Sequence, residues 1–502
     1  MDCRQMIGFI TGKPGRHPYP EHMQQARRIA SEGMVLLKND NQVLPLQAEK
    51  VALFGAGAVD TVVCGTGSGY VFAPYTVNVE QGLRDAGMTL TSGGWLRRFA
   101  DRSRRANKED KTLTKLDRLW SGLSILIDEI EIMDADLEEA READTAIYVI
   151  RRNSGEGKDR KAEKGDYYLS DIEERNLRRL AAAFPKVAVV LNTCVVDANF
   201  LWEIPGIDAA LLMGQAGNES GNALADVLTG KVNPSGHLTD TWARKYSDNP
   251  ASAVFGANDG NSLQEDYVED IFVGYRYFDT FHIQPLFPFG YGLSYTTFRK
   301  TCKEVRVDWK QITMTVEITN TGRLSGRDVV QVYVTAPEGR LTKPYQELKG
   351  YRKTKELKSG ETQTVTITIP TESLSSFDTG KSAFIMEPGD YLLRMGSSSR
   401  DTETVGVIRL DREAAVRQVR NEFRPDRELK TWEAPARKQE AVSAPIKEGV
   451  AQVSVNGDGS KRVTYRGTDR GAYLERGDVQ ACVCRVLEQI MNSVSYREMI
   501  KA

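Results

Sequence analysis

The sequence is poor in cysteine and histidine, and its charges nearly cancel. Its 502 residues include six cysteines and four histidines, too few and too scattered for a disulfide framework or a zinc site. We expect no metal and no cofactor. The 67 basic residues almost balance the 69 acidic ones, which leaves a net charge of −2. Without a strong field of either sign, we expect neither a nucleic-acid partner nor binding to an anionic membrane.

Long hydrophobic runs are also missing. No segment approaches 18 consecutive apolar residues, and the first 20 residues lack the apolar stretch of a secretory signal. We therefore expect a cytoplasmic protein that does not span a membrane. Length alone suggests several cores, at roughly 150 residues for each domain.

Residues 1–298 alternate short apolar runs with helix-like stretches. The runs are continuous rather than alternating, which is typical of strands in a parallel sheet covered by helices on both faces. We predict an α/β sandwich domain with a mostly parallel sheet over this range. The highly charged stretch at about 96–142 is interpreted as a solvated helical insertion. The apolar runs lie at 51–54, 145–150, 187–191 and 209–213.

From residue 299 the apolar period changes to two. Alternating runs separated by turn signals such as KSG and EPGD predict an all-β sandwich over 299–412. The protein is thus predicted to be multidomain, α/β followed by all-β. Residues 413–450 are charged and contain prolines, which indicates a linker. The tail at 451–502 is predicted to hold a short β-like stretch and a final helix at about 476–491.

Glu156 is the strongest candidate for chemistry. It follows the predicted strand at 145–150, and ligand sites in open α/β sheets lie at the carboxyl ends of strands. Gly155 and Gly157 allow the loop to turn sharply and leave the carboxyl group uncrowded. By itself the pattern also fits an exposed, ion-paired surface residue. The pattern alone does not decide between these two interpretations.

The surrounding residues decide in favour of a site, because they resemble a known family. The stretch RRNSGEGKDRKAEKGDYYLSDIEERNL at 151–177 is similar to the acid/base loop of glycoside hydrolase family 3, in its β-glucosidase-like members. The residues NTGRLSGRDVVQVYV and KPYQELKGY resemble the fibronectin type III-like domain that follows in that family. Other motifs match in the same order: EGMVLLKNDNQVLPL at 32–46, GTGSGYV at 65–71, GKVNPSGHLTDTW at 230–242 and VGYRYFDTFHIQPLFPFGYGLSYTTF at 273–298.

The resemblance assigns roles to two residues. It implies that Glu156 is the general acid/base of a retaining hydrolysis of β-linked glucosides or similar small glycosides, and that Ser68 contacts the bound sugar. A structural turn remains the alternative for Ser68. The aromatic residues Tyr275, Tyr277, Phe289 and Tyr291 are interpreted as interdomain packing residues rather than sugar platforms.

The family's nucleophile has no counterpart in the sequence. In the family it is an aspartate in an S-D-W-like motif on a (β/α)8 barrel, and a barrel needs about 250 residues. The one Asp-Trp pair, Asp308-Trp309, falls in a predicted sandwich strand. Some family members are circularly permuted with the barrel last, and the motif order here matches them. The chain thus resembles a permuted member without most of its barrel, and its final helix resembles a barrel remnant, although a generic amphipathic helix fits equally well.

Two functions follow from this pattern. The first is a β-glucosidase component that is inactive alone and receives its nucleophile from an absent barrel, from a barrel-bearing partner chain or from a homo-oligomer. The second is a non-catalytic sugar-binding or assembly module derived from such an enzyme.

Overall fold

The computed structural model describes residues 20–66, 69–71, 73, 75–110, 126–153, 160–253, 255, 267–308, 310–422 and 431–435, together with the backbone of 451–455 and 461–465. The chain divides into two compact units. We call the first the α/β unit and the second the β-rich unit. The α/β unit comprises Met1–Asn249, Gln284–Thr297 and Asn320–Asp328, and the β-rich unit comprises Pro250–Ile283, Phe298–Thr319 and Val329–Ala502.

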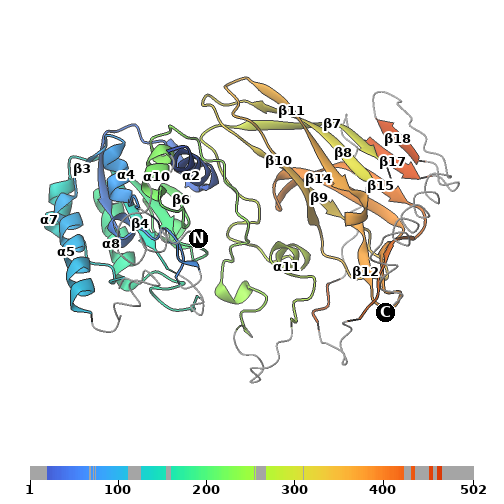
Figure 1. The fold of residues 1–502 in the computed structure, drawn as a ribbon, viewed down its shortest axis with the longest axis horizontal. Helices are drawn as coiled ribbons and strands as arrows, with labels where there is room; N and C mark the ends of the chain where they lie inside the picture. Colours follow the sequence, from blue (N-terminus) through green and yellow to red (C-terminus); the bar gives the residue numbers. More distant parts are fainter. Residues whose placement is uncertain are drawn as a thin grey trace, which may run out of the picture. The chain divides into compact units, whose positions relative to one another are not determined.

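The α/β unit is built on a six-stranded sheet with the order β1-β6-β5-β4-β2-β3. Figure 1 labels three strands of this sheet, β3, β4 and β6, and the helices beside it. Strand β1 is antiparallel to β6, and the other neighbours are parallel. The predicted α/β class with a mostly parallel sheet is therefore confirmed. The strands are β1 (Val35–Asn39), β2 (Lys50–Phe54), β3 (Thr89–Leu90), β4 (Thr145–Arg151), β5 (Lys186–Asn192) and β6 (Ala209–Leu212).

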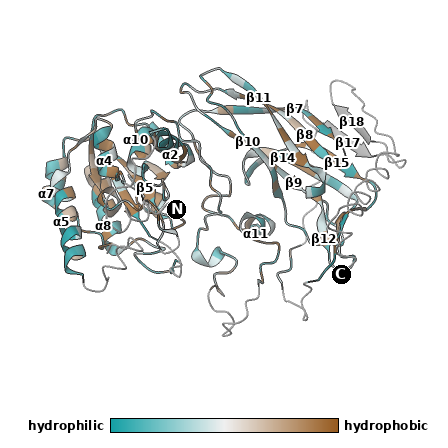
Figure 2. Cartoon of the chain, viewed as in Figure 1, coloured by the Kyte–Doolittle hydropathy of each residue, from teal (hydrophilic) through white to brown (hydrophobic). Residues whose placement is uncertain are grey.

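Helices cover both faces of this sheet, which is why its strands are apolar. Every residue of β4 is buried, as are the last six of β5, because both sheet faces are covered. Figure 2 shows the contrast between these hydrophobic strands and the hydrophilic outer sides of α5 and α7. The helices are α2 (Pro20–Gly33), α3 (Ala56–Val59), α4 (Val79–Asp85), α5 (Gly93–Glu109), α7 (Asp134–Ala140), α8 (Asp171–Ala183), α9 (Phe200–Glu203) and α10 (Ser220–Leu228), with short 3-10 turns η1 (Asp40–Gln42) and η3 (Tyr246–Asp248).

Helices α4 and α10 approach each other through two glycines. A Cβ atom added to Gly82 would lie 2.1 Å from the carbonyl carbon of Gly221, and one added to Gly221 would lie 1.9 Å from the carbonyl oxygen of Asn78. These contacts leave no room for a side chain at either position. The pair therefore sets the spacing of the two helices.

The described part of the charged insertion includes most of α5 and all of α7, and it is partly buried. Helix α5 buries Trp95, Leu96 and Phe99, and the Trp95 ring lies edge-on to Phe54 with centroids 5.7 Å apart. Farther along the insertion, the Asn176 side chain forms hydrogen bonds with the backbone of Ile130 and Ile132. The interpretation as a solvated insertion is therefore wrong for α5, because its charges lie on one helix face while the other face is apolar and buried.

The β-rich unit contains a six-stranded sheet, β10-β9-β14-β15-β17-β18, and two three-stranded sheets, β11-β8-β7 and β12-β13-β16. Alternate residues of β8 are buried, as the period of two predicts, and they join one apolar core. The predicted all-β sandwich is confirmed. Its elements are α11 (Tyr275–Thr280), β7 (Phe298–Val307), β8 (Gln311–Asn320), β9 (Val329–Thr335), β10 (Glu347–Lys353), β11 (Thr362–Pro370), η5 (Thr371–Leu374), β12 (Ser376–Asp378), β13 (Ala383–Met386), β14 (Gly389–Ser398), β15 (Asp401–Leu410), β16 (Ala414–Gln418), β17 (Ala451–Val455) and β18 (Lys461–Tyr465).

The units differ from the expected domain limits in three places. The segment Asn320–Asp328, expected in the sandwich, groups with the α/β unit. The segment Pro250–Ile283, expected in the α/β domain, groups with the β-rich unit. The expected linker at 413–450 begins with β16, which pairs with β13, so the chain continues its sheet pairing beyond residue 412. The predicted helix at 476–491 lies outside the described residues. Within the described ranges, no helix is both long and apolar enough to cross a bilayer.

Candidate active site

Both predicted site residues, Glu156 and Ser68, lie outside the described residues, but the segments that lead to them are described. Strand β4 ends at Arg151, and the Glu156 segment follows directly between Asn153 and Arg160. Strand β2 ends at Phe54 and leads through α3 toward Ser68. Because β2 and β4 are parallel neighbours, both segments leave the same edge of the sheet, where ligand sites of open α/β sheets are found.

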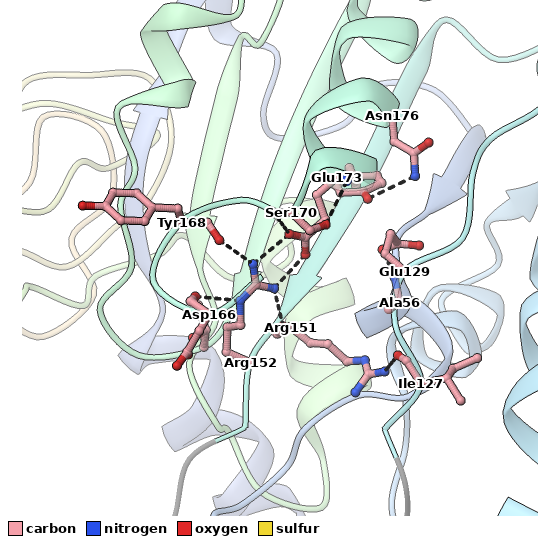
Figure 3. A network of polar contacts seen from close by, with 12 residues as sticks. Ala56, Ile127, Glu129, Arg151, Arg152, Asp166, Tyr168, Ser170, Glu173 and Asn176 are labelled. Carbon is pink, nitrogen blue, oxygen red and sulfur yellow. Dashed lines mark hydrogen bonds and ion pairs between the residues drawn. The ribbon is translucent and has the colours of Figure 1, made fainter. Parts of the chain in front are cut away.

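Arg152 anchors the chain at the start of the Glu156 segment. Its guanidinium donates two hydrogen bonds to the Glu173 carboxylate, at 2.7 and 2.8 Å (Figure 3). It also donates to the backbone carbonyls of Arg151, Asp166 and Tyr168, at 2.7, 2.8 and 3.3 Å. Burial lowers the pKa of Arg152, but the bonds to Glu173 together with the negative charges of Glu173 and Asp166 outweigh burial and leave that pKa above its ordinary value. The Arg152 side chain is therefore positively charged, and hydrogen bonds to neighbouring protein groups hold it in place.

A second anchor holds the end of the segment. Arg160 donates to the Asp166 carboxylate at 2.6 Å and to the Thr193 hydroxyl at 3.2 Å, and the Lys161 amide donates to the other Asp166 oxygen at 2.8 Å. Burial raises the pKa of Asp166, but the Lys161 amide and the Arg160 charge outweigh it, so the pKa lies below its ordinary value. The carboxylate is ionised at neutral pH.

Asn192, at the end of β5, joins the neighbouring loops. Its side-chain oxygen accepts a bond from the Val62 amide at 2.7 Å. Its side-chain nitrogen donates to the carbonyls of Val62 and Gly214, at 2.8 and 2.7 Å. The loop that leads to Ser68 is thus tied to β5 and to the turn after β6. Sequence reasoning missed this residue, since an asparagine ending an apolar run carries no distinctive signal.

Glu129 is a buried carboxyl group near the same edge, and it too was missed. It accepts hydrogen bonds from the amides of Ala56 and Ile130, at 2.8 and 3.0 Å. Burial raises the pKa of Glu129 to about 7; the two amides oppose this shift, and the charge of Glu173 adds to it. Arg151 lies in the same network and donates to the Ile127 carbonyl at 2.7 Å (Figure 3). In the sequence, Glu129 looks no different from its exposed neighbours Asp128 and Glu131.

The turn GQAGNESG, which opens α10, contributes a buried carboxylate as well. Glu219 accepts hydrogen bonds from the Tyr75 hydroxyl and from the Asn222 side chain. Burial, together with Glu219, raises the pKa of Tyr75 to about 12. These contacts give the turn a structural role, because they tie it to Tyr75, which follows the Ser68 loop in the chain.

Three of the aromatic residues of the 273–298 motif, Tyr275, Tyr277 and Tyr291, each have a contact within their own unit. The Tyr275 hydroxyl accepts a bond from the Leu348 amide at 2.8 Å, and the Tyr277 ring lies 4.6 Å from the Phe281 ring. The Tyr291 hydroxyl donates to the Leu37 carbonyl at 3.1 Å.

Asp308 accepts two backbone bonds in the turn before β8. Trp309 lies outside the described residues.

The described residues hold the loops at one edge of the sheet through hydrogen bonds and ion pairs. Within the described part of the chain, no group of three or more His, Cys, Asp or Glu side chains could hold a metal ion.

Comparison with known proteins places this architecture in a family. Residues 34–295 match the glycosyl hydrolase family 3 C-terminal domain, and residues 328–399 match the fibronectin type III-like domain. Beta-glucosidase A of Butyrivibrio fibrisolvens is 36% identical over 452 residues, covering 81% of this chain and 53% of that protein. The beta-glucosidase of Ruminococcus albus is 35% identical over 417 residues, covering 81% of this chain and 42% of that protein.

A solved structure agrees with the sequence match. Beta-glucosidase 3B from Thermotoga neapolitana, in complex with alpha-D-glucose, superposes with a TM-score of 0.73 at 36% identity, over 81% of this chain and 56% of that one. The chain spans about half the length of the relatives it matches. Because the C-terminal-domain match covers more than half of the 502 residues and is followed in order by the fibronectin-like match, the chain belongs to glycosyl hydrolase family 3.

Proposed function

We propose that the chain supplies the acid/base half of a retaining β-glucosidase. Glu156 would protonate the leaving glycosidic oxygen as an aspartate nucleophile attacks the anomeric carbon. The Glu156 carboxylate would then take a proton from water, whose oxygen displaces the nucleophile. The observation that carries the proposal is the anchoring of the Glu156 segment by Arg152 and Arg160 at the carboxyl edge of the sheet.

The nucleophile would come from a barrel that these 502 residues do not contain. The relatives named beta-glucosidase are about twice as long as the part that this chain matches. The barrel would belong to a separate chain, a second copy or a longer polypeptide of which this is a part. Ser68 would contact the sugar from the neighbouring loop, and the substrate would be a small β-linked glucoside.

Activity in a completed assembly tests the proposal. The chain is mixed with the barrel domain of a relative, and release of nitrophenol from an aryl β-glucoside is measured. We expect turnover from the mixture and its loss with Glu156→Gln. Glu163→Gln is the matched control, because Glu163 is exposed in the same stretch. Full activity of Glu156→Gln would remove Glu156 from the mechanism.

The same samples distinguish the non-catalytic alternative. A sugar-binding module would bind glucose in a calorimeter and yet show no turnover with any barrel. A glycosidase component would show turnover only when the barrel is present.

A further inference from the structure

We propose that helix α11 carries an aromatic docking site for the segment 431–435 of the same chain, with Trp432 as the anchor. The rings of Tyr277 and Phe281 form the site, and the docked segment holds the chain that follows the sandwich onto α11. The inference does not depend on hydrolysis, and all of its residues belong to the β-rich unit.

The first argument is that α11 is a rigid support. Asp279 is buried and pairs with Arg400 at 2.6 Å. Arg400 also donates a hydrogen bond to the Phe278 carbonyl at 2.8 Å. One turn earlier, the Tyr275 hydroxyl accepts a hydrogen bond from the Leu348 amide at 2.8 Å. These contacts fix one face of α11 against the strands of the sandwich.

The second argument is that Tyr277 and Phe281 lie on the opposite face. Positions four apart share one side of a helix, and at 3.6 residues per turn this side is opposite to that of Tyr275 and Asp279. The ring centroids of Tyr277 and Phe281 lie 4.6 Å apart, and the Phe281 ring is edge-on to the buried Phe272 ring at 5.2 Å. The two rings therefore present an apolar surface on a fixed support.

The third argument is the way in which Trp432 meets this surface. Its ring centroid lies 4.6 Å from that of Tyr277 and 6.0 Å from that of Phe281, within the range in which aromatic pairs attract each other. Trp432 and Ala434 are half-buried, whereas residues 431, 433 and 435 are exposed, so alternate residues face the protein, as in an extended chain. Trp432 is also the one aromatic residue between positions 424 and 450, which makes it the natural anchor of this charged stretch.

Fluorine NMR of the full chain tests the docking. The six tryptophans are replaced by 5-fluorotryptophan, and the Trp432 line is identified by its absence from Trp432→Phe. A docked indole tumbles with the whole chain, so this line should be broad. In the double variant Tyr277→Ala with Phe281→Ala, the broad line should be lost and replaced by a narrow one at the position found in an unfolded peptide.

The matched control is Tyr351→Ala, which removes a tyrosine of the same unit that is 67% exposed and should leave the Trp432 line unchanged. A Trp432 line that stays broad in the folded double variant would overturn the proposal, as would a narrow line in the wild type.

A peptide supplied in trans decides the question if the double variant fails to fold. The peptide TWEAP has the sequence of residues 431–435; it carries 5-fluorotryptophan and is added at millimolar concentration to the full chain of Trp432→Ala. A short tether gives an effective concentration on the order of 1 mM, so a site that holds Trp432 should bind this peptide and broaden its line. The wild-type chain, whose own Trp432 fills the site, should broaden the line far less. Equal line widths with the two chains would contradict a docking site on α11.

Discussion

The two units bury their polar groups in different places. In the α/β unit, Arg152, Glu173 and Asn192 collect at the carboxyl ends of parallel strands and bond to the loops that begin there. In the β-rich unit, the buried pair of Lys343 and Glu387 holds a turn, and Asp279 with Arg400 holds α11 to the sandwich. The first pattern anchors loops at one edge of the parallel sheet, whereas the second stabilises the domain itself.

The largest expected effect tests the buried polar residues at the carboxyl ends of the parallel strands. Arg152→Met leaves the Glu173 carboxylate buried without its cation, so the free energy of unfolding of the α/β unit should fall by about 3–5 kcal/mol. Urea unfolding followed by circular dichroism measures this change. Arg178→Met, at an exposed pair, should stay within about 1 kcal/mol of the wild type. Equal losses of unfolding free energy in the two variants would show that the buried Arg152–Glu173 pair contributes no more than the exposed Arg178–Glu174 pair.

The next effect tests the apolar core of the β-rich unit. Ile318 is fully buried in the sandwich, and Ile318→Ala should lower the stability of that unit by about 2–5 kcal/mol through a cavity. The companion variant Thr315→Ala, on the opposite face of β8, should cost less than about 1 kcal/mol. Thermal melting of both variants makes the comparison. A small loss at Ile318 would mean that the sandwich core repacks readily.

A third effect depends on pH and concerns Glu129. Its folded pKa of about 7 lies above the ordinary value of 4.5, so burial penalises the charged form. The stability associated with the neutral form is fully present below about pH 4.5 and is lost as pH rises to about 7. Compared with Glu129→Gln, the wild type should lose up to about 3 kcal/mol over that interval. Urea titrations of both proteins at several pH values measure this, and a pH-independent difference would contradict it.

The smallest effect tests the helix crossing in the α/β unit. Gly82→Ala forces a Cβ atom against the Gly221 backbone and should cost about 1–3 kcal/mol, despite the better helix propensity of alanine. Gly33, at the end of α2, has no atom within 4 Å of an added Cβ. Gly33→Ala should therefore leave the melting temperature almost unchanged. A neutral Gly82→Ala would show that the two helices separate easily.

Periodicity and motif order predicted the architecture well. Continuous apolar runs indicated the parallel strands, and the change to a period of two indicated the sandwich. The charged insertion was misjudged because composition averages over a helix whose two faces differ: Trp95 and Phe99 are buried beside exposed arginines. The segment Pro250–Ile283 was assigned by its order in the chain, although its grouping depends on contacts with distant residues.

By itself, the sequence determined the fold class and the family, because strand and helix periods and motif spacing are local properties of the chain. Only the tertiary structure decided which polar residues support the candidate site. Arg152 bonds Glu173 across 21 positions, Ala56 bonds Glu129 across 73, and Asn192 bonds Val62 across 130. No local pattern marks such partners, since a side-chain hydrogen bond depends on the distance between two atoms after folding, whatever their separation in sequence.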